Sequence, residues 1–135
     1  MSKPIVLFLC QHNAGRSQLA AALMGHRAGD RYDVRSAGIA PAEKINAAGA
    51  ATLAELGIDT SHRTPRAVTT QDLAEADVVV AMKPGLTLPA TPAGRLIVWE
   101  LPDPGDWDAE SIRPLRDEID ARVQQLAADL RSGSH

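Results

Sequence analysis

Continuous apolar runs and helical stripes follow one another along the chain. Runs rich in β-branched or aromatic residues cover 5–9, 77–82 and 95–99, and a short alternating segment covers 32–35. Such runs are typical of strands in a parallel sheet, which are buried on both faces. Segments with helical character lie between them. Strands that alternate with helices predict a doubly wound α/β domain with a four-stranded parallel sheet and helices on both faces.

Three helices with their boundaries can be predicted before the last one. A helix over 17–28 is expected to end at Gly29 in a left-handed conformation. A second helix begins after Asn46, turns Leu53 and Leu56 toward the core, and stops at Gly57. The sequence 69–72, Thr-Thr-Gln-Asp, resembles a capping box that opens a helix of one or two turns.

The last helix has the most regular pattern. Apolar residues spaced three or four apart form one stripe: Ile112, Leu115, Ile119, Val123, Leu126 and Leu130. Pro114 is therefore expected in the first turn, where its missing N–H has no cost. Glu118 and Arg122 are expected to form an exposed pair one turn apart.

The segment from Cys10 to Ser17 carries the candidate chemistry. It joins the first apolar run to a helix, so backbone N–H groups and a helix N-terminus can converge there on an anion. Cys10 is the predicted nucleophile, because this N-terminus, the Arg16 guanidinium and the Ser17 hydroxyl all favour its thiolate. Arg16 is expected to hold an oxyanion at two points, and Ser17 to cap the helix as well. The predicted anion-binding residues are Gln11, His12, Asn13, Ala14, Gly15 and Arg16. The alternative is that a lone cysteine is only a small buried apolar residue.

Length, charge and composition narrow the possibilities further. The chain has 135 residues, which suits one domain over 1–131 with a flexible tail over 132–135. A net charge of −3 without a basic run argues against nucleic acid as a partner. The first apolar run, 5–9, is too short for a signal peptide or membrane span, so we expect a cytoplasmic protein without membrane contact. His26 and His62 have no partner at ligand spacing, and no metal is predicted.

The pattern Cys10-x-x-Asn13-x-x-Arg16-Ser17 resembles the signature of the low-molecular-weight protein tyrosine phosphatase superfamily. The form His-Asn-Ala-Gly-Arg-Ser-Gln over 12–18 is more similar to the arsenate reductase branch of that superfamily. The resemblance covers nearly the whole chain and implies a flavodoxin-like fold. It also implies that the Asn13 side chain joins a network with a serine at the end of the second strand, where Ser36 stands.

The resemblance further assigns a role to the Asp103-Pro104 pair. In the family, the aspartic acid of such a pair protonates the leaving group, which requires a carboxyl group that reaches the anion site. Asp103 is accordingly the expected proton-handling residue, with Asp106 and Asp108 as alternatives. His12 is expected to line the site or tune its pH response rather than to react.

Two departures from the family pattern point to the substrate and the reductant. Aromatic residues that enclose a phosphotyrosine ring are missing after Pro104, although Trp107 is near enough in sequence to reach the rim. A small tetrahedral oxyanion therefore suits the loop better. Residues 81–85 lack the two cysteines of thioredoxin-coupled arsenate reductases, so an internal disulfide relay is impossible.

The sequence thus favours a single-cysteine arsenate reductase that passes arsenic to a small thiol. Eleven arginines against three lysines hint at a GC-rich genome, which favours mycothiol over glutathione as the co-substrate, with a glutaredoxin-like reductant. Candidates for guiding the thiol are His12, His62, Arg63 and Arg66. The alternatives are a phosphatase that forms a phosphocysteine at Cys10, and a non-enzymatic oxyanion-binding module.

Overall fold

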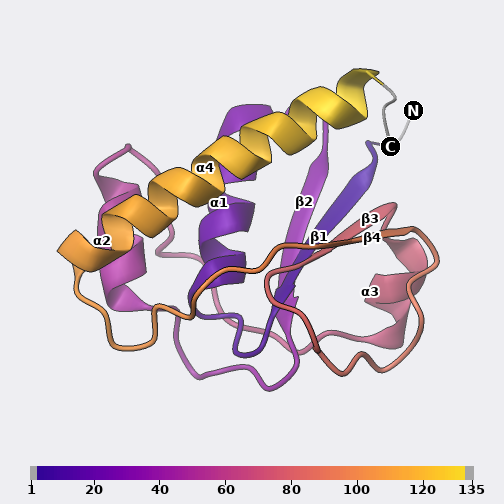
Figure 1. Cartoon of the computed structure of the whole chain (residues 1–135), viewed down its shortest axis with the longest axis horizontal. Coiled ribbons are helices and arrows are strands. Elements are labelled where there is room, and N and C mark those ends of the chain that lie inside the picture. Colours follow the sequence, from indigo (N-terminus) through magenta and orange to yellow (C-terminus); the bar gives the residue numbers. More distant parts are fainter. Residues whose placement is uncertain (1–2, 133–135) are drawn as a thin grey trace.

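The structure is a computed structural model that describes residues 3–132. The elements in this range follow the predicted alternation (Figure 1). They are β1 (Ile5–Cys10), α1 (Arg16–Ala28), β2 (Asp33–Gly38), α2 (Ala47–Ala54), α3 (Thr70–Glu75), β3 (Val78–Ala81), β4 (Arg95–Val98) and α4 (Ala109–Ser132). Within this range, no helix combines the length and the apolar character needed to cross a lipid bilayer.

The four strands form one sheet in the order β2-β1-β3-β4, and every neighbouring pair is parallel. The predicted fold class is therefore confirmed. The chain passes from β1 to β2 on one side and then crosses to β3 on the other side of β1. In doubly wound sheets, ligands bind beyond the carboxyl ends of the strands at such a reversal. The fold thus places the residues that follow Cys10 at the expected ligand-binding edge.

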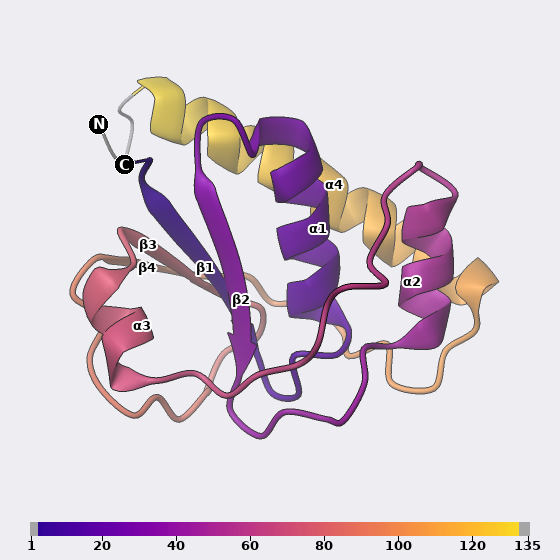
Figure 2. The ribbon, with the colours of Figure 1, turned by 180° about the vertical axis from the view of Figure 1, so that it is seen from behind.

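Helices cover both faces of the sheet, as Figures 1 and 2 show. Alternate side chains of β1 point to opposite faces, so Val6 and Phe8 join the core beneath α1 and α4. Leu7 and Leu9 join a second, smaller core beneath α3. The capping box predicted for α3 is confirmed, since Thr69 and Asp72 exchange side-chain to backbone hydrogen bonds. Burial of β1 on both faces fixes the position of the loop that follows it.

Two predicted helix ends differ from the structure. Gly29 follows α1 with φ −64° and ψ −16°, so the predicted left-handed conformation is wrong. Leu56, predicted to face the core, is 37% exposed. The reason is that α2 ends at Ala54, so Leu56 no longer follows the helical period that buries Leu53. Gly57, where the helix was predicted to stop, lies three residues after Ala54 and has a left-handed conformation with φ +78°.

The predicted apolar stripe of α4 lies in the larger core, with Leu130 partly buried, and the helix packs against α1 and α2; the predicted position of Pro114, however, is wrong. The helix begins at Ala109, because Asp108 accepts the backbone N–H of Ser111, so Pro114 lies in the second turn. The carbonyl that Pro114 leaves without an N–H belongs to Glu110, which is exposed to solvent. Of the predicted tail over 132–135, Ser132 still belongs to α4, and the rest lies outside the described residues.

Candidate active site

A cavity of about 300 Å³ opens at the carboxyl end of β1, beside the N-terminus of α1. It is lined by Cys10, His12, Ala14, Gly15, Arg16, Ala42, Asn46, Asp103 and Gly105. The structure therefore brings the predicted nucleophile, the predicted arginine clamp and the predicted acid to one place. Of the other predicted anion-binding residues, Gln11 and Asn13 are not among the lining residues. Gln11 instead uses its carbonyl to accept the N–H of Ala40.

The sulfur of Cys10 lies in a directed network of hydrogen bonds. Cys10 is 2% exposed, and its Sγ lies 2.8 Å from Ser17 Oγ. The backbone N–H of Asn13 donates to the sulfur at 3.2 Å. Asn13 Nδ2 also donates to Ser17 Oγ at 2.8 Å, which leaves the serine hydrogen free to point at the sulfur. Two donors thus face the sulfur, an arrangement that favours its thiolate.

Ser17 does not cap α1, so that part of its predicted role is wrong. The N-cap is Gly15, which has no side chain to accept a hydrogen bond, and Ser17 is the second residue of the helix. From that position its hydroxyl is directed toward Cys10 rather than toward the helix backbone. The unpaired N–H groups of the first turn therefore remain available for an anion in the cavity.

Asn13 adopts a left-handed backbone conformation, with φ 51°. Its predicted connection to Ser36 is not made: Asn13 Oδ1 accepts the backbone N–H of Arg66 at 3.0 Å and Gln18 Nε2 at 3.3 Å. The physical reason is that the loop that carries Asn13 packs against the main chain at the end of β2, beside Gly38. A methyl group on Gly38 would lie 2.8 Å from Asn13 N, so main-chain atoms fill the space between the loop and this strand.

Arg16 connects the anion loop to the segment that carries Asp103. Its guanidinium is almost fully buried; Nη1 donates to the carbonyl of Leu101 at 3.0 Å, and Nη2 lies 3.7 Å from Asp103 Oδ2. The two segments also touch at Gly15, where an added methyl group would lie 2.9 Å from Pro104 Cγ. Arg16 can therefore hold an oxyanion in the cavity while it fixes the wall that faces Cys10.

Of the three acidic candidates, Asp103 is the one in the cavity lining. Its side chain is 55% exposed, and Oδ1 accepts the N–H of Gly105. Asp108 instead begins α4, and hydrogen bonds from the backbone and side chain of Ser111 lower its pKa. Asp106 is exposed and outside the cavity lining. A carboxylate at the rim, close to the arginine, is placed to exchange protons with a bound group.

Sequence reasoning missed Asn46 as a residue of the site. Asn46 was predicted to precede a helix, and its Oδ1 does cap α2 by accepting the N–H of Gly49. Its Nδ2 in addition donates to the carbonyl of Gly105 at 2.8 Å, which ties α2 to the segment after Asp103. The cap was visible in the sequence, whereas the second bond joins segments far apart in the chain and left no local signal.

Three of the four residues suggested to guide a thiol lie elsewhere. His12 lines the cavity, and its Nδ1 lies 3.1 Å from the carbonyl of Ala40. His62, Arg63 and Arg66 line a separate hollow of about 520 Å³ together with Ser36. The prediction is therefore wrong for these three, because their side chains line this separate hollow and are not in the lining of the cavity.

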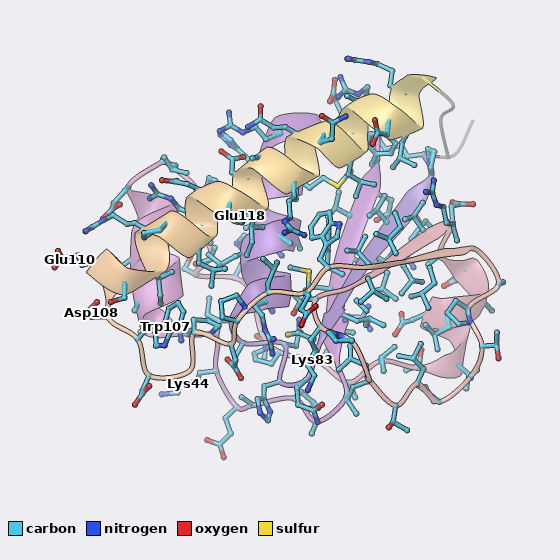
Figure 3. All side chains as sticks on the ribbon, viewed as in Figure 1. Lys44, Lys83, Trp107, Asp108, Glu110 and Glu118 are labelled. Atoms are coloured by element: carbon cyan, nitrogen blue, oxygen red, sulfur yellow. The ribbon has the colours of Figure 1, made fainter. Side chains whose placement is uncertain are left out.

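The aromatic side chains do not build a slot for a phosphotyrosine ring. Trp107 lies by the start of α4 (Figure 3) and lines a different hollow, with Leu101 and Pro114. Phe8 packs against Trp99 within the core, with ring centroids 5.9 Å apart. Among the described residues, no group of three or more His, Cys, Asp or Glu side chains is placed to hold a metal ion. No Phe, Tyr or Trp side chain is therefore among the described residues that line the cavity.

Comparison with known proteins agrees with this geometry. The family described as low molecular weight phosphotyrosine protein phosphatase matches residues 5–134. An arsenate reductase of Halalkalibacterium halodurans is 34% identical over 136 residues, which cover 94% of this chain and 97% of that protein.

Two solved structures are also similar. The thioredoxin-dependent arsenate reductase of Corynebacterium glutamicum shares 34% identity with a TM-score of 0.83; the match covers 98% of this chain but only 64% of that one. An arsenate reductase in the phosphate binding state shares 27% identity with a TM-score of 0.84, over 93% of this chain and 98% of that one. The chain belongs to the low molecular weight phosphotyrosine protein phosphatase family, in its arsenate reductase branch.

Proposed function

We propose that the protein is an arsenate reductase in which Cys10 attacks arsenate and a small external thiol, mycothiol, completes the transfer. The observation that carries the proposal is a single cysteine, held in a hydrogen-bond network and lining a cavity of about 300 Å³ together with Arg16. Arsenate is a tetrahedral oxyanion, so the loop N–H groups, the N-terminus of α1 and Arg16 can bind its oxygens. The names of the similar proteins support the same substrate.

The first step needs no change of oxidation state. The Cys10 thiolate forms a bond to arsenic while one arsenate oxygen leaves as water after protonation, for which Asp103 is the nearest carboxyl group. A small thiol then attacks the arsenic and replaces Cys10, which returns as a thiolate. The product is an adduct of pentavalent arsenic and the small thiol, released from the cavity.

Reduction of the adduct needs a second sulfur from outside the chain. Arsenate takes up two electrons when it becomes arsenite, and these electrons come from two thiols that are joined in a disulfide. Cys10 is the single cysteine of the chain, and residues 81–85, which follow β3, contain none. A second molecule of thiol, or the thiolate of a glutaredoxin-like protein, attacks the sulfur of the adduct and releases arsenite.

The proposal is tested with purified protein, arsenate and a set of reductants, by direct measurement of arsenite. Protein and arsenate alone should give no catalytic arsenite, and mycothiol with a glutaredoxin-like protein should give sustained turnover. A parallel assay with glutathione and a glutaredoxin tests whether glutathione is the co-substrate instead of mycothiol. Cys10→Ser is the matched control and should be inactive in every arm. Sustained turnover on thioredoxin and its reductase alone would contradict the proposal, and the similarity to a thioredoxin-dependent protein makes that arm essential.

A second candidate function is phosphate monoester hydrolysis through a phosphocysteine. The observation that favours it is the position of Asp103, a half-exposed carboxylate in the cavity lining and 3.7 Å from Arg16, where it can protonate a leaving oxygen. Against it stands the absence of an aromatic slot from the cavity lining described above. Hydrolysis of an aryl phosphate, measured beside arsenate reduction on the same preparation, distinguishes the two functions.

A further inference from the structure

Gln18, the third residue of α1, has an unusual set of contacts for a buried side chain. It is 4% exposed, and its Nε2 donates to the carbonyl oxygen of Asn13 at 3.0 Å and to Asn13 Oδ1 at 3.3 Å. Its own Oε1 is buried without a hydrogen-bond partner among the described residues. A buried acceptor without a partner is destabilising, and an apolar side chain of similar size would avoid it. The presence of glutamine at this position is therefore explained by the two oxygen atoms of Asn13 to which its Nε2 donates.

The orientation of both amides follows from their partners. The backbone N–H of Arg66 can only donate, so the atom of Asn13 that faces it must be Oδ1. Both Asn13 atoms that face Gln18 are then acceptors, and Gln18 must present its NH₂ group to them. The reverse orientation would place the oxygen of Gln18 against two other oxygens.

The contacts of Gln18 reach the sulfur of Cys10 by two routes through Asn13. With Asn13 Oδ1 held by Gln18, the Nδ2 of the same amide is directed at Ser17 Oγ, whose hydrogen then points at the sulfur. With the Asn13 carbonyl held in its left-handed conformation, the backbone N–H of Asn13 donates directly to the sulfur. The second route depends on main-chain geometry that is uncommon outside glycine.

We propose that Gln18 is a positioning residue that acts through Asn13 and Ser17 to stabilise the Cys10 thiolate. It has no contact with the sulfur, and its effect is to keep two donors directed at that atom. The inference rests on the proposed role of Cys10 as the nucleophile and is independent of which oxyanion is the substrate.

The test measures the reactivity of the thiol and needs no substrate. The rate of alkylation by iodoacetamide is measured against pH for the wild-type protein, Gln18→Met, Ser17→Ala and the double variant. Met retains the volume of Gln without its donors, so Gln18→Met should slow alkylation at a pH below the midpoint by about three- to tenfold, the effect of about one hydrogen bond. The alkylation midpoint should move to higher pH. Gln18→Glu, which presents oxygens to both Asn13 acceptors, should be slower than Gln18→Met.

The double variant separates positioning from general damage. If Gln18 acts through Ser17, the combined effect of the two substitutions on alkylation is clearly smaller than the product of the single effects. Gln125→Met, the same substitution on the exposed side of α4, should leave alkylation unchanged. Circular dichroism establishes that each variant is folded.

Two results would overturn the proposal: an unchanged alkylation profile in folded Gln18→Met, or full multiplicativity in the double variant. Because arsenate does not enter this experiment, failure of the proposed reductase activity would leave the result intact. Conversely, if the wild-type protein reduces arsenate and Gln18→Met is alkylated normally, only the proposed role of Gln18 is disproved.

Discussion

Replacement of Arg16 by lysine keeps the positive charge of the site but removes the planar, two-point geometry of the guanidinium. The guanidinium now donates to the carbonyl of Leu101 with Nη1, while Nη2 faces Asp103 Oδ2 at 3.7 Å. An oxyanion in the cavity would be held by two parallel N–H groups of such a fork. A lysine ammonium is a point charge that cannot hold two oxygens and reach the carbonyl of Leu101 at the same time.

The size of the loss follows from the bonds that lysine cannot make. One charge-assisted hydrogen bond contributes about 1.5–3 kcal/mol, so the loss of one of the two bonds to the oxyanion weakens binding about 10- to 150-fold. The carbonyl of Leu101, a residue that is 7% exposed, also loses its donor, which loosens the segment before Asp103. We therefore expect Arg16→Lys to lower kcat/KM by at least tenfold and to affect oxyanion binding itself.

Protection of Cys10 from iodoacetamide by phosphate measures binding without turnover, and arsenite formation measures catalysis. Arg27→Lys is the matched control, since Arg27 lies in the same helix and makes a two-point contact with Asp120, at 3.0 and 2.6 Å, away from the cavity. Both measurements should be unchanged in that variant. If Arg16→Lys retained more than half of the wild-type protection and turnover, the assignment of Arg16 as a two-point clamp would be wrong.

Two further predictions concern Asp103 in the cavity and the two arginines that line the separate hollow. Asp103→Asn should slow hydrolysis of an aryl phosphate with a poor leaving group by roughly 10²–10⁴ and have little effect with a good one; equal losses would indicate a structural role. Burial lowers the pKa of Arg63, whose Nε has no partner among the described residues, so Arg63→Met should not lower the free energy of unfolding in urea. In contrast, Arg66→Met should cost about 1 kcal/mol, because Asp72 loses its two-point contact with Arg66 and keeps the hydrogen bond from Thr69. Burial by itself would raise the pKa of Asp72, but hydrogen bonds from Arg66 and Thr69 outweigh this and lower it. A loss in Arg63→Met as large as in Arg66→Met would refute this distinction.

The sequence predicted the parts of the site that are contiguous in the chain. The strand, the loop and the first turn of α1 follow one another, so the spacing from Cys10 to Arg16 sets their geometry locally. The left-handed conformation of Asn13 is also local in origin, because Asn adopts this conformation more readily than most other residue types. Asp103 could be placed only through the family resemblance, since nothing local connects an Asp-Pro turn to a distant cysteine.

The errors arose where tertiary contacts decide. Ser36 occupies the expected place in β2, yet the loop amide is held by Gln18 and by the main chain of Arg66, a contact across the edge of the sheet. Leu56 and Pro114 were misplaced because the position of each depends on the residue at which a helix ends or begins, which the apolar period does not show. Periodicity predicts which face of a helix is buried but defines its ends poorly.

The unequal burial of the site defines the direction from which a thiol can reach arsenic under the proposed function. Cys10 is almost completely enclosed, with Asn13 and Ser17 donating to its sulfur from the loop and the helix. Asp103, in the same cavity lining, is 55% exposed. The segment that carries it is joined to the rest of the site by Arg16 and by the bond between Asn46 and Gly105. Under the proposed function, an incoming thiol would enter past the exposed part of the cavity lining, which includes Asp103 and His12. The carboxylate that gives a proton to the leaving oxygen would there be placed to take one from the thiol, so one side chain at the open side of the cavity would serve both steps.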